Sequence, residues 1–259
     1  MSANSTALYF TVQGEGKPLI IIHGLFGSAD NWRTLAKKFA ENYQVFCIDL
    51  RNHGRSPHVD GMSYNEMAAD LLSFMDQQAI SKAHIIGHSM GGKVAMQFAL
   101  NHAERVEHLV VADIAPVAYQ HGHTDVLAAF DAVQALGGVA SRKEADEVMS
   151  AHVDSLGIRQ FLMTNLEKKV DGKLGWRVGL AQIKQGYADV IKAPEGEVFT
   201  GDTLFIRGEL SEYVLDEYQE VMLKLFPAST LATLSGTGHW LHAEKPLEFL
   251  QQVSEFLSA

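Results

Sequence analysis

The chain has 259 residues, of which 47% are hydrophobic and 20% charged, a composition typical of globular proteins. It contains only 6 prolines and no compositionally biased tract, which excludes a disordered or fibrous chain. Asp and Glu total 31 against 21 Lys and Arg, and the formal net charge of −10 is not offset by any basic cluster, so we expect no nucleic-acid partner. The longest apolar runs fall far short of the roughly 18 residues of a membrane span, so we expect none.

Cysteine usage and the opening of the chain favour a reducing compartment. The single cysteine, Cys47, cannot form an internal disulfide, and its apolar neighbours predict a buried, inert thiol. Residues 1–6 are polar and lack the basic and apolar regions of a signal peptide. These features predict a cytoplasmic protein.

The first predicted elements are two strands, at residues 8–12 and 19–22. A glycine-containing segment separates them, and this arrangement predicts a hairpin. A helix capped by Asp30 follows, with apolar residues at helical spacing as far as Phe39.

Strands and helices alternate regularly over the next part of the chain. The predicted elements are strand 44–48, a helix opened by a capping box at Ser63 and Glu66, strand 84–86, helix 90–101 and strand 108–114. Because such alternation is typical of parallel crossover units, we predict an α/β fold, a mostly parallel sheet covered by helices on both faces.

The pattern changes between residues 118 and 200, where helical periodicity appears without convincing buried strands. We predict a helical cap over residues 118–200, inserted into a core domain formed by residues 1–117 and 201–259. Strand patterns return at residues 203–207 and 229–234, and a final amphipathic helix follows.

The sharpest chemical signal is a G-x-S-x-G pentapeptide centred on Ser89, between a predicted strand and a predicted helix. A tight turn at this place holds a serine hydroxyl outward, and side chains at Gly87 and Gly91 would collide with neighbouring backbone. We therefore predict that Ser89 is a nucleophile.

A serine nucleophile needs a base, and His239 is the best candidate because glycines in the loop after the last predicted strand bring its imidazole back over the sheet. His242 lies three residues further on, but no Glu, Asp or Cys follows at ligand spacing, so we expect no metal site. The chemistry requires no metal or organic cofactor.

The acid that orients the histidine has two possible locations. Asp113 ends the strand after the nucleophile helix, whereas Glu209 and Glu212 follow the next core strand, where Ser211 occupies the position usually expected to hold an aspartate. We favour Asp113, with Glu209 or Glu212 as the alternatives.

Attack by serine creates an oxyanion that backbone amides must stabilise. The amide of Met90 follows the nucleophile directly, and Leu25, with Phe26 as the second choice, supplies the other from the loop after strand 19–22. In the same loop, His23 is expected to be a hydrogen-bonded scaffold residue. Polar residues 49–56 are expected to brace their own loop.

Taken together, these motifs resemble the α/β-hydrolase superfamily across nearly the whole chain, and the YbfF-like esterase group in particular. The motifs that carry the resemblance are residues 23–28 (HGLFGS), 49–56 (DLRNHGRS), 87–92 (GHSMGG), 113–117 (DIAPV) and 238–246 (GHWLHAEKP).

The resemblance implies an eight-stranded, mostly parallel sheet with a helical cap inserted after the strand that ends at Asp113. It also implies hydrolysis of small or medium acyl esters, with acyl-CoA thioesters as a further substrate class, through an acyl-enzyme on Ser89. The side chains expected to line the substrate pocket are those of Phe26, Phe161, Leu162, Trp176, Tyr187 and Trp240.

Fold alone does not fix the reaction. Haloperoxidase chemistry without a cofactor, acyl transfer, lyase chemistry and a non-catalytic ligand receptor remain the alternatives on the same scaffold. We expect the partner to be a small-molecule ester and the protein to be a monomer or a small homo-oligomer.

Overall fold

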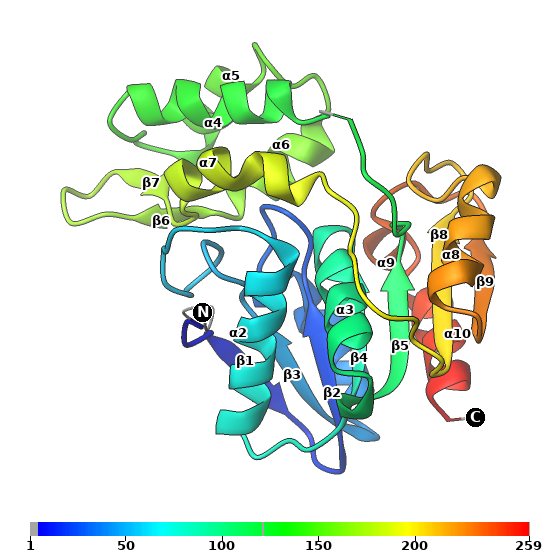
Figure 1. Ribbon diagram of the computed structural model, residues 1–259. Helices are drawn as coiled ribbons and strands as arrows, with labels where there is room; N and C mark the ends of the chain where they lie inside the picture. The colour runs from blue at the N-terminus through cyan, green and yellow to red at the C-terminus, as the bar shows by residue number, and fades with distance from the viewer. Residues whose placement is uncertain (1–4, 121, 259) are drawn as a thin grey trace.

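The computed structural model describes residues 5–120 and 122–258, so residues 1–4 of the polar opening lie outside the description. The strand order of the main sheet is β1-β3-β2-β4-β5-β8-β9, and every neighbouring pair is parallel except β1 with β3 (Figure 1). The strands are β1 (Phe10–Gln13), β2 (Lys17–Ile22), β3 (Tyr43–Ile48), β4 (Ala83–His88), β5 (Val106–Ala112), β8 (Thr203–Gly208) and β9 (Ser229–Leu234). The predicted α/β class is confirmed.

The predicted amino-terminal hairpin is wrong, because β3 lies between β1 and β2. Strand β2 is fully buried from Leu19 to Ile22, and only a central position with parallel neighbours on both sides covers it that completely. The expected eighth strand is also absent from the main sheet of the described residues. Each of the seven runs with strand periodicity in the sequence forms one strand, and no other run carries that pattern.

Helices cover both faces of the sheet. Side chains of β2 alternate between the two faces. Leu19 and Ile21 belong to the hydrophobic cluster formed with α1 (Arg33–Phe39) and α10 (Pro246–Leu257). Ile20 and Ile22 belong to the cluster formed with α2 (Tyr64–Gln77) and α3 (Met90–Asn101). The helical elements that accompany the sheet are η1 (Ala29–Trp32), α1 (Arg33–Phe39), α2 (Tyr64–Gln77), α3 (Met90–Asn101), η2 (Ala103–Arg105), η3 (Asp216–Tyr218), α8 (Gln219–Leu225), α9 (Leu241–Glu244) and α10 (Pro246–Leu257).

Local sequence signals set several of these helix ends. The predicted capping box of α2 is confirmed: the amide of Ser63 donates to Glu66 Oε2 over 3.0 Å, and the amide of Glu66 donates to Ser63 Oγ over 3.3 Å. Asp30, in contrast, lies within the 3-10 turn η1 and does not cap a helix; that turn begins after Ser28, whose amide donates to the side chain of Asn31.

Between β5 and β8 the chain forms a separate layer over the carboxyl ends of the strands, which we call the cap (Figure 1). Its elements are α4 (Thr124–Ala135), α5 (Arg142–Met149), α6 (Leu156–Met163), β6 (Leu166–Lys168), β7 (Leu174–Trp176) and α7 (Leu180–Val190). The antiparallel ribbon β6–β7 departs from the purely helical insertion that we predicted. Its strands have three residues each, too few to show an alternating pattern in the sequence.

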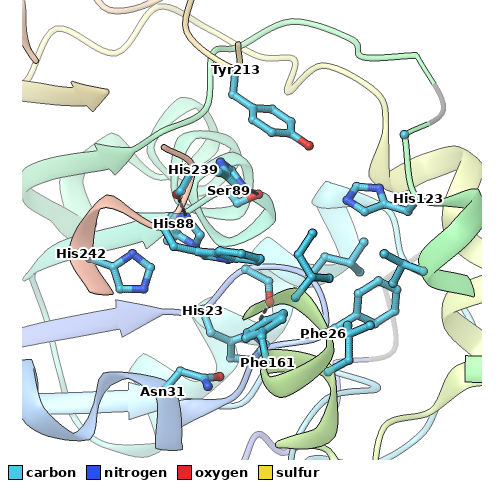
Figure 2. A pocket seen from close by; sticks show the side chains of 18 of the residues that line it. His23, Phe26, Asn31, His88, Ser89, His123, Phe161, Tyr213, His239 and His242 are labelled. Atoms are coloured by element: carbon cyan, nitrogen blue, oxygen red, sulfur yellow. Dashed lines mark hydrogen bonds between the residues drawn. The ribbon is translucent and has the colours of Figure 1, made fainter. Parts of the chain in front are cut away.

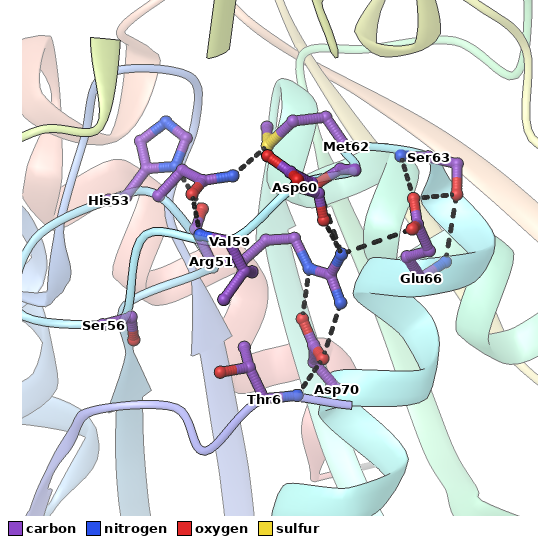
Figure 3. Close-up of polar contacts among 12 residues, drawn as sticks. Thr6, Arg51, His53, Ser56, Val59, Asp60, Met62, Ser63, Glu66 and Asp70 are labelled. Atoms are coloured by element: carbon purple, nitrogen blue, oxygen red, sulfur yellow. Dashed lines mark hydrogen bonds and ion pairs between the residues drawn. The ribbon is translucent and has the colours of Figure 1, made fainter. Parts of the chain in front are cut away.

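The loop after β3 is braced by a buried ion pair (Figure 3). Arg51 Nε donates to Asp70 Oδ2 over 2.6 Å and Nη2 donates to Oδ1 over 2.9 Å, and Nη1 of Arg51 reaches the carbonyl of Gly61. Asn52 next to it has φ 66° and donates to the sulfur of Met62. These contacts fit the bracing role expected for residues 49–56.

No helix in the described part of the chain is long and apolar enough to cross a membrane.

Candidate active site

Ser89 lies at the junction of β4 and α3, on a turn that only the surrounding glycines permit. Its φ of 53° is in the left-handed region that non-glycine residues rarely adopt. A Cβ at Gly87 would lie 2.3 Å from the carbonyl oxygen of Gly91, and one at Gly91 would lie 2.4 Å from that of His23. The turn therefore requires both glycines, as the sequence pattern indicates.

A continuous hydrogen-bonded relay connects Ser89, His239 and Asp113. The hydroxyl of Ser89 and His239 Nε2 are 2.9 Å apart, and His239 Nδ1 and Asp113 Oδ2 are 2.7 Å apart. Because an ionised carboxylate only accepts hydrogen bonds, Nδ1 carries the proton and Nε2 accepts from the serine hydroxyl. This geometry is that of a base poised to take the proton of a nucleophile.

Asp113 is completely buried, and backbone and side-chain donors hold its carboxylate in place. Oδ1 accepts from the amide of Gly208 over 2.9 Å, and Oδ2 accepts from the hydroxyl of Ser211 as well as from His239. The alternatives lie elsewhere: Glu209 accepts from the amide of Gly236, and Glu212 is exposed. The contacts therefore favour Asp113 as the acid.

The loop after β2 lies directly against the serine. A Cβ at Gly24 would lie 3.2 Å from Ser89 Cβ, so Leu25 follows at close range. Met90 is the first residue of α3, where backbone amides have no partner within the helix. Leu25 and Met90 line one cavity with Ser89, an arrangement that fits the two amides expected to stabilise an oxyanion.

The serine and the histidine face a cavity of about 440 Å³ between the sheet and the cap (Figure 2). Of the six side chains expected to line a pocket, four line this cavity: Phe26, Phe161, Leu162 and Trp240. Tyr187 lines a smaller neighbouring cavity that also reaches Ser89. The expectation for Trp176 is corrected, since its indole donates to the carbonyl of Phe130 in the interior of the cap.

Comparison with known proteins identifies the family. Residues 17–246 match the family model described as the alpha/beta hydrolase fold. The chain belongs to the α/β-hydrolase family.

Several relatives of this hydrolase are named as esterases or lipases. Esterase YbfF of Escherichia coli K12 is 36% identical over the full length of both chains. The sn-1-specific diacylglycerol lipase ABHD11 of zebrafish, Danio rerio, is 38% identical over 98% of this chain and 82% of its own length. A solved structure described as a marine microorganism esterase has 41% identity and a TM-score of 0.94, and covers 97% of this chain and 100% of its own. Family and relatives together identify the chain as an enzyme, a serine ester hydrolase.

Several buried histidines surround the site of this α/β-hydrolase, and burial lowers the pKa of each. His23 Nε2 accepts from the amide of Leu50, which fits the predicted scaffold role, and burial lowers the pKa of His23 to about 4. Burial and the neighbouring histidines hold the pKa of His88 well below its usual value. His242 stacks on Trp32 with ring centroids 4.4 Å apart, and burial lowers the pKa of His242 to about 3.

Within residues 5–120 and 122–258, no group of three or more acidic, histidine or cysteine side chains is arranged to hold a metal ion.

Sequence reasoning missed two positioning residues. His88 Nε2 donates over 2.8 Å to the carbonyl of His239 and so holds in place the loop that carries the base. Asn165 reaches from the cap and donates over 2.7 Å to the carbonyl of Phe26, whose φ is 61°. His88 is a variable position of the serine pentapeptide, and Asn165 lies 139 residues from its partner, so neither carried a local signal.

Proposed function

We propose that this hydrolase cleaves carboxyl esters of small or medium acyl groups through an acyl-enzyme on Ser89. The observation that carries the proposal is the relay from Ser89 through His239 to the buried Asp113, facing a largely apolar cavity of about 440 Å³. This volume lies within the roughly 300–1,000 Å³ range of small-molecule sites.

In the first half-reaction, Ser89 Oγ attacks the ester carbonyl while His239 Nε2 takes the hydroxyl proton. The tetrahedral oxyanion accepts hydrogen bonds from the amides of Leu25 and Met90, with Phe26 as the second choice for the loop amide. Asp113 stabilises the imidazolium that forms. His239 then returns its proton to the departing alkoxide, and the alcohol leaves.

In the second half-reaction, water attacks the acyl-serine carbonyl and gives its proton to His239 Nε2. The same two amides stabilise the second oxyanion. When this intermediate collapses, the bond from the acyl carbon to Ser89 Oγ breaks, His239 returns its proton to Ser89 Oγ, and the carboxylic acid is released. Each proton and each developing charge has a group of this chain to receive it, so the proposed scheme calls for no metal or organic cofactor.

Thioesters are the second candidate substrate class, because the same attack opens an acyl thioester. An acyl-CoA carries several phosphate charges toward a chain of net charge −10. We therefore rank uncharged carboxyl esters above acyl-CoA thioesters. Comparing kcat/KM for p-nitrophenyl butyrate and butyryl-CoA tests this order, and a clear preference for the thioester reverses it.

Covalent labelling tests the nucleophile. A fluorophosphonate probe is expected to label the intact protein and Ser81→Ala, an exposed serine control, but not Ser89→Ala. Hydrolysis of p-nitrophenyl acetate or butyrate should follow the same pattern. Folded protein that resists the probe favours a ligand receptor. Labelling without ester hydrolysis favours acyl transfer, lyase or haloperoxidase chemistry.

A further inference from the structure

Two cavities meet at Ser89, and they differ greatly in size. We call these cavities the larger arm and the smaller arm of the site. The larger arm, of about 440 Å³, is lined by Phe26 from the loop after β2 and by Phe161 and Leu162 from the cap. The smaller arm, of about 50 Å³, extends from Ser89 between α3 and the carboxyl-terminal part of α7. An ester bound at Ser89 has an acyl half and an alcohol half, joined at the carbonyl carbon that Ser89 attacks, so each arm receives one half.

The position of His239 decides which half enters which arm. The histidine has to protonate the leaving alkoxide, so the alcohol half must lie on the side of its imidazole. His239 and the adjacent Trp240 line the larger arm, and neither lines the smaller one. Met90, which follows the nucleophile, lines only the smaller arm. The alcohol therefore occupies the larger arm and the acyl chain points into the smaller arm.

The volume of the smaller arm limits the acyl chain. A space that holds one water-sized group takes up about 10–15 Å³ on this scale, so about 50 Å³ accommodates roughly three to five non-hydrogen atoms. The larger arm, by the same reasoning, accommodates roughly thirty or more.

Hydrogen bonds fix the walls of the smaller arm, so it cannot expand easily. The hydroxyl of Tyr64 donates to the carbonyl of Val190 over 2.5 Å, and Lys93 Nζ donates to the carbonyl of Lys192 over 2.5 Å. The hydroxyl of Tyr187 is hydrogen-bonded to His123 Nδ1 at 2.6 Å. Tyr64 and Lys93 are almost completely buried, which leaves them no alternative partner in water.

We infer that this enzyme selects esters that join a short acyl group, of roughly two to four carbons, to a bulky apolar alcohol. The inference rests on the proposed acyl-enzyme on Ser89 and adds the substrate class to it. Apolar side chains of Phe26, Phe161 and Trp240 bury the alcohol half. A long acyl chain, in contrast, meets the hydrogen-bonded side chains of Tyr64, Lys93 and Tyr187 in the smaller arm.

Isomeric esters give a direct test. Octyl acetate and methyl nonanoate contain the same atoms, but the long chain belongs to the alcohol in the first and to the acyl group in the second. With kcat/KM divided by each ester's rate of alkaline hydrolysis, the wild-type enzyme should prefer octyl acetate by at least about ten-fold, because even one methylene that a pocket cannot hold costs roughly that factor. Equal or reversed values overturn the inference.

Variants on the two arms provide matched controls. Tyr187→Ala opens the smaller arm and should raise relative turnover of methyl nonanoate, whereas Phe161→Ala removes a wall of the larger arm and should lower that of octyl acetate. Opposite shifts support the inference, and shifts in the same direction contradict it. The wild-type comparison decides the matter even if a variant does not fold.

The outcomes separate this inference from the proposed function. If both isomers are hydrolysed equally and the fluorophosphonate labels Ser89, the acyl-enzyme stands and the assignment of the two arms fails. If the folded protein is not labelled and hydrolyses neither isomer, the proposed function itself fails.

Discussion

Replacing Asp113 by asparagine should place the proton of His239 on the wrong nitrogen. The carboxylate accepts on both oxygens, from the amide of Gly208 on Oδ1 and from Ser211 and His239 on Oδ2. An asparagine has one acceptor oxygen and one donor nitrogen. The backbone amide of Gly208 can only donate, so the new oxygen must face it and the new nitrogen must face His239.

An amide nitrogen at this place donates to His239 Nδ1, and the imidazole then carries its proton on Nε2. That nitrogen can no longer accept the proton of Ser89, although it still lies 2.9 Å from the hydroxyl. Loss of the correct tautomer in such a relay lowers kcat by about 10⁴, which corresponds to about 5 kcal/mol of activation free energy. Asp113→Asn keeps the shape of the side chain, so KM should change little.

Steady-state hydrolysis of p-nitrophenyl butyrate measures this effect, with circular dichroism to verify the fold. Glu209→Gln and Glu212→Gln make the same chemical change at the two alternative acids and should retain nearly full kcat. Near-normal turnover in Asp113→Asn, or an equal loss in either glutamine variant, would refute the reasoning and move the acid to that glutamate.

Three further predictions follow from buried polar groups. Ser211→Ala removes a donor to the Asp113 carboxylate and should lower kcat by about ten-fold to a hundred-fold at constant KM, because a hydrogen bond to a charged group contributes about 1.5–3 kcal/mol. Ser211→Thr keeps the hydroxyl and should recover the activity. Burial lowers the pKa of Lys93 to about 7 from 10.5, so the unfolded chain binds more protons between these pH values and stability rises with pH across this window. In wild-type protein this increase in the free energy of unfolding is at most about 5 kcal/mol, and urea titrations at several pH values should show that Lys93→Met loses it. The same pH dependence in both proteins would contradict a lowered pKa for Lys93. Arg51→Met leaves Asp70 charged and unpaired in the interior and should lower the free energy of unfolding by about 3–5 kcal/mol, whereas a loss below about 1 kcal/mol would contradict that account.

Much of the fold and of the site could be predicted because it depends on short-range patterns. The strands appear as apolar runs, and the capping box at Ser63 and Glu66 marks a helix start within four residues. The glycines around Ser89 are a local steric requirement, since a Cβ at either one collides with backbone only a few Å away. Such features depend on chain neighbours and periodicity, which the sequence displays directly.

The choice among possible partners required the tertiary structure. Asp113 and Glu209 each end a strand, and only the packing of the loop that carries His239 brings one carboxylate to 2.7 Å from the imidazole. The place of β3 between β1 and β2 and the reach of Asn165 to the carbonyl of Phe26 are decided in the same way.

The sequence by itself therefore determined the α/β class, the serine turn and the kind of residues that accompany it. Only the tertiary structure decided which carboxylate contacts the histidine, how the strands are ordered, and how the cavity divides around Ser89 into a large and a small arm. The physical reason is range: local sterics act between near neighbours in the chain, whereas contacts across a hundred residues are selected by the free energy of burying the whole core.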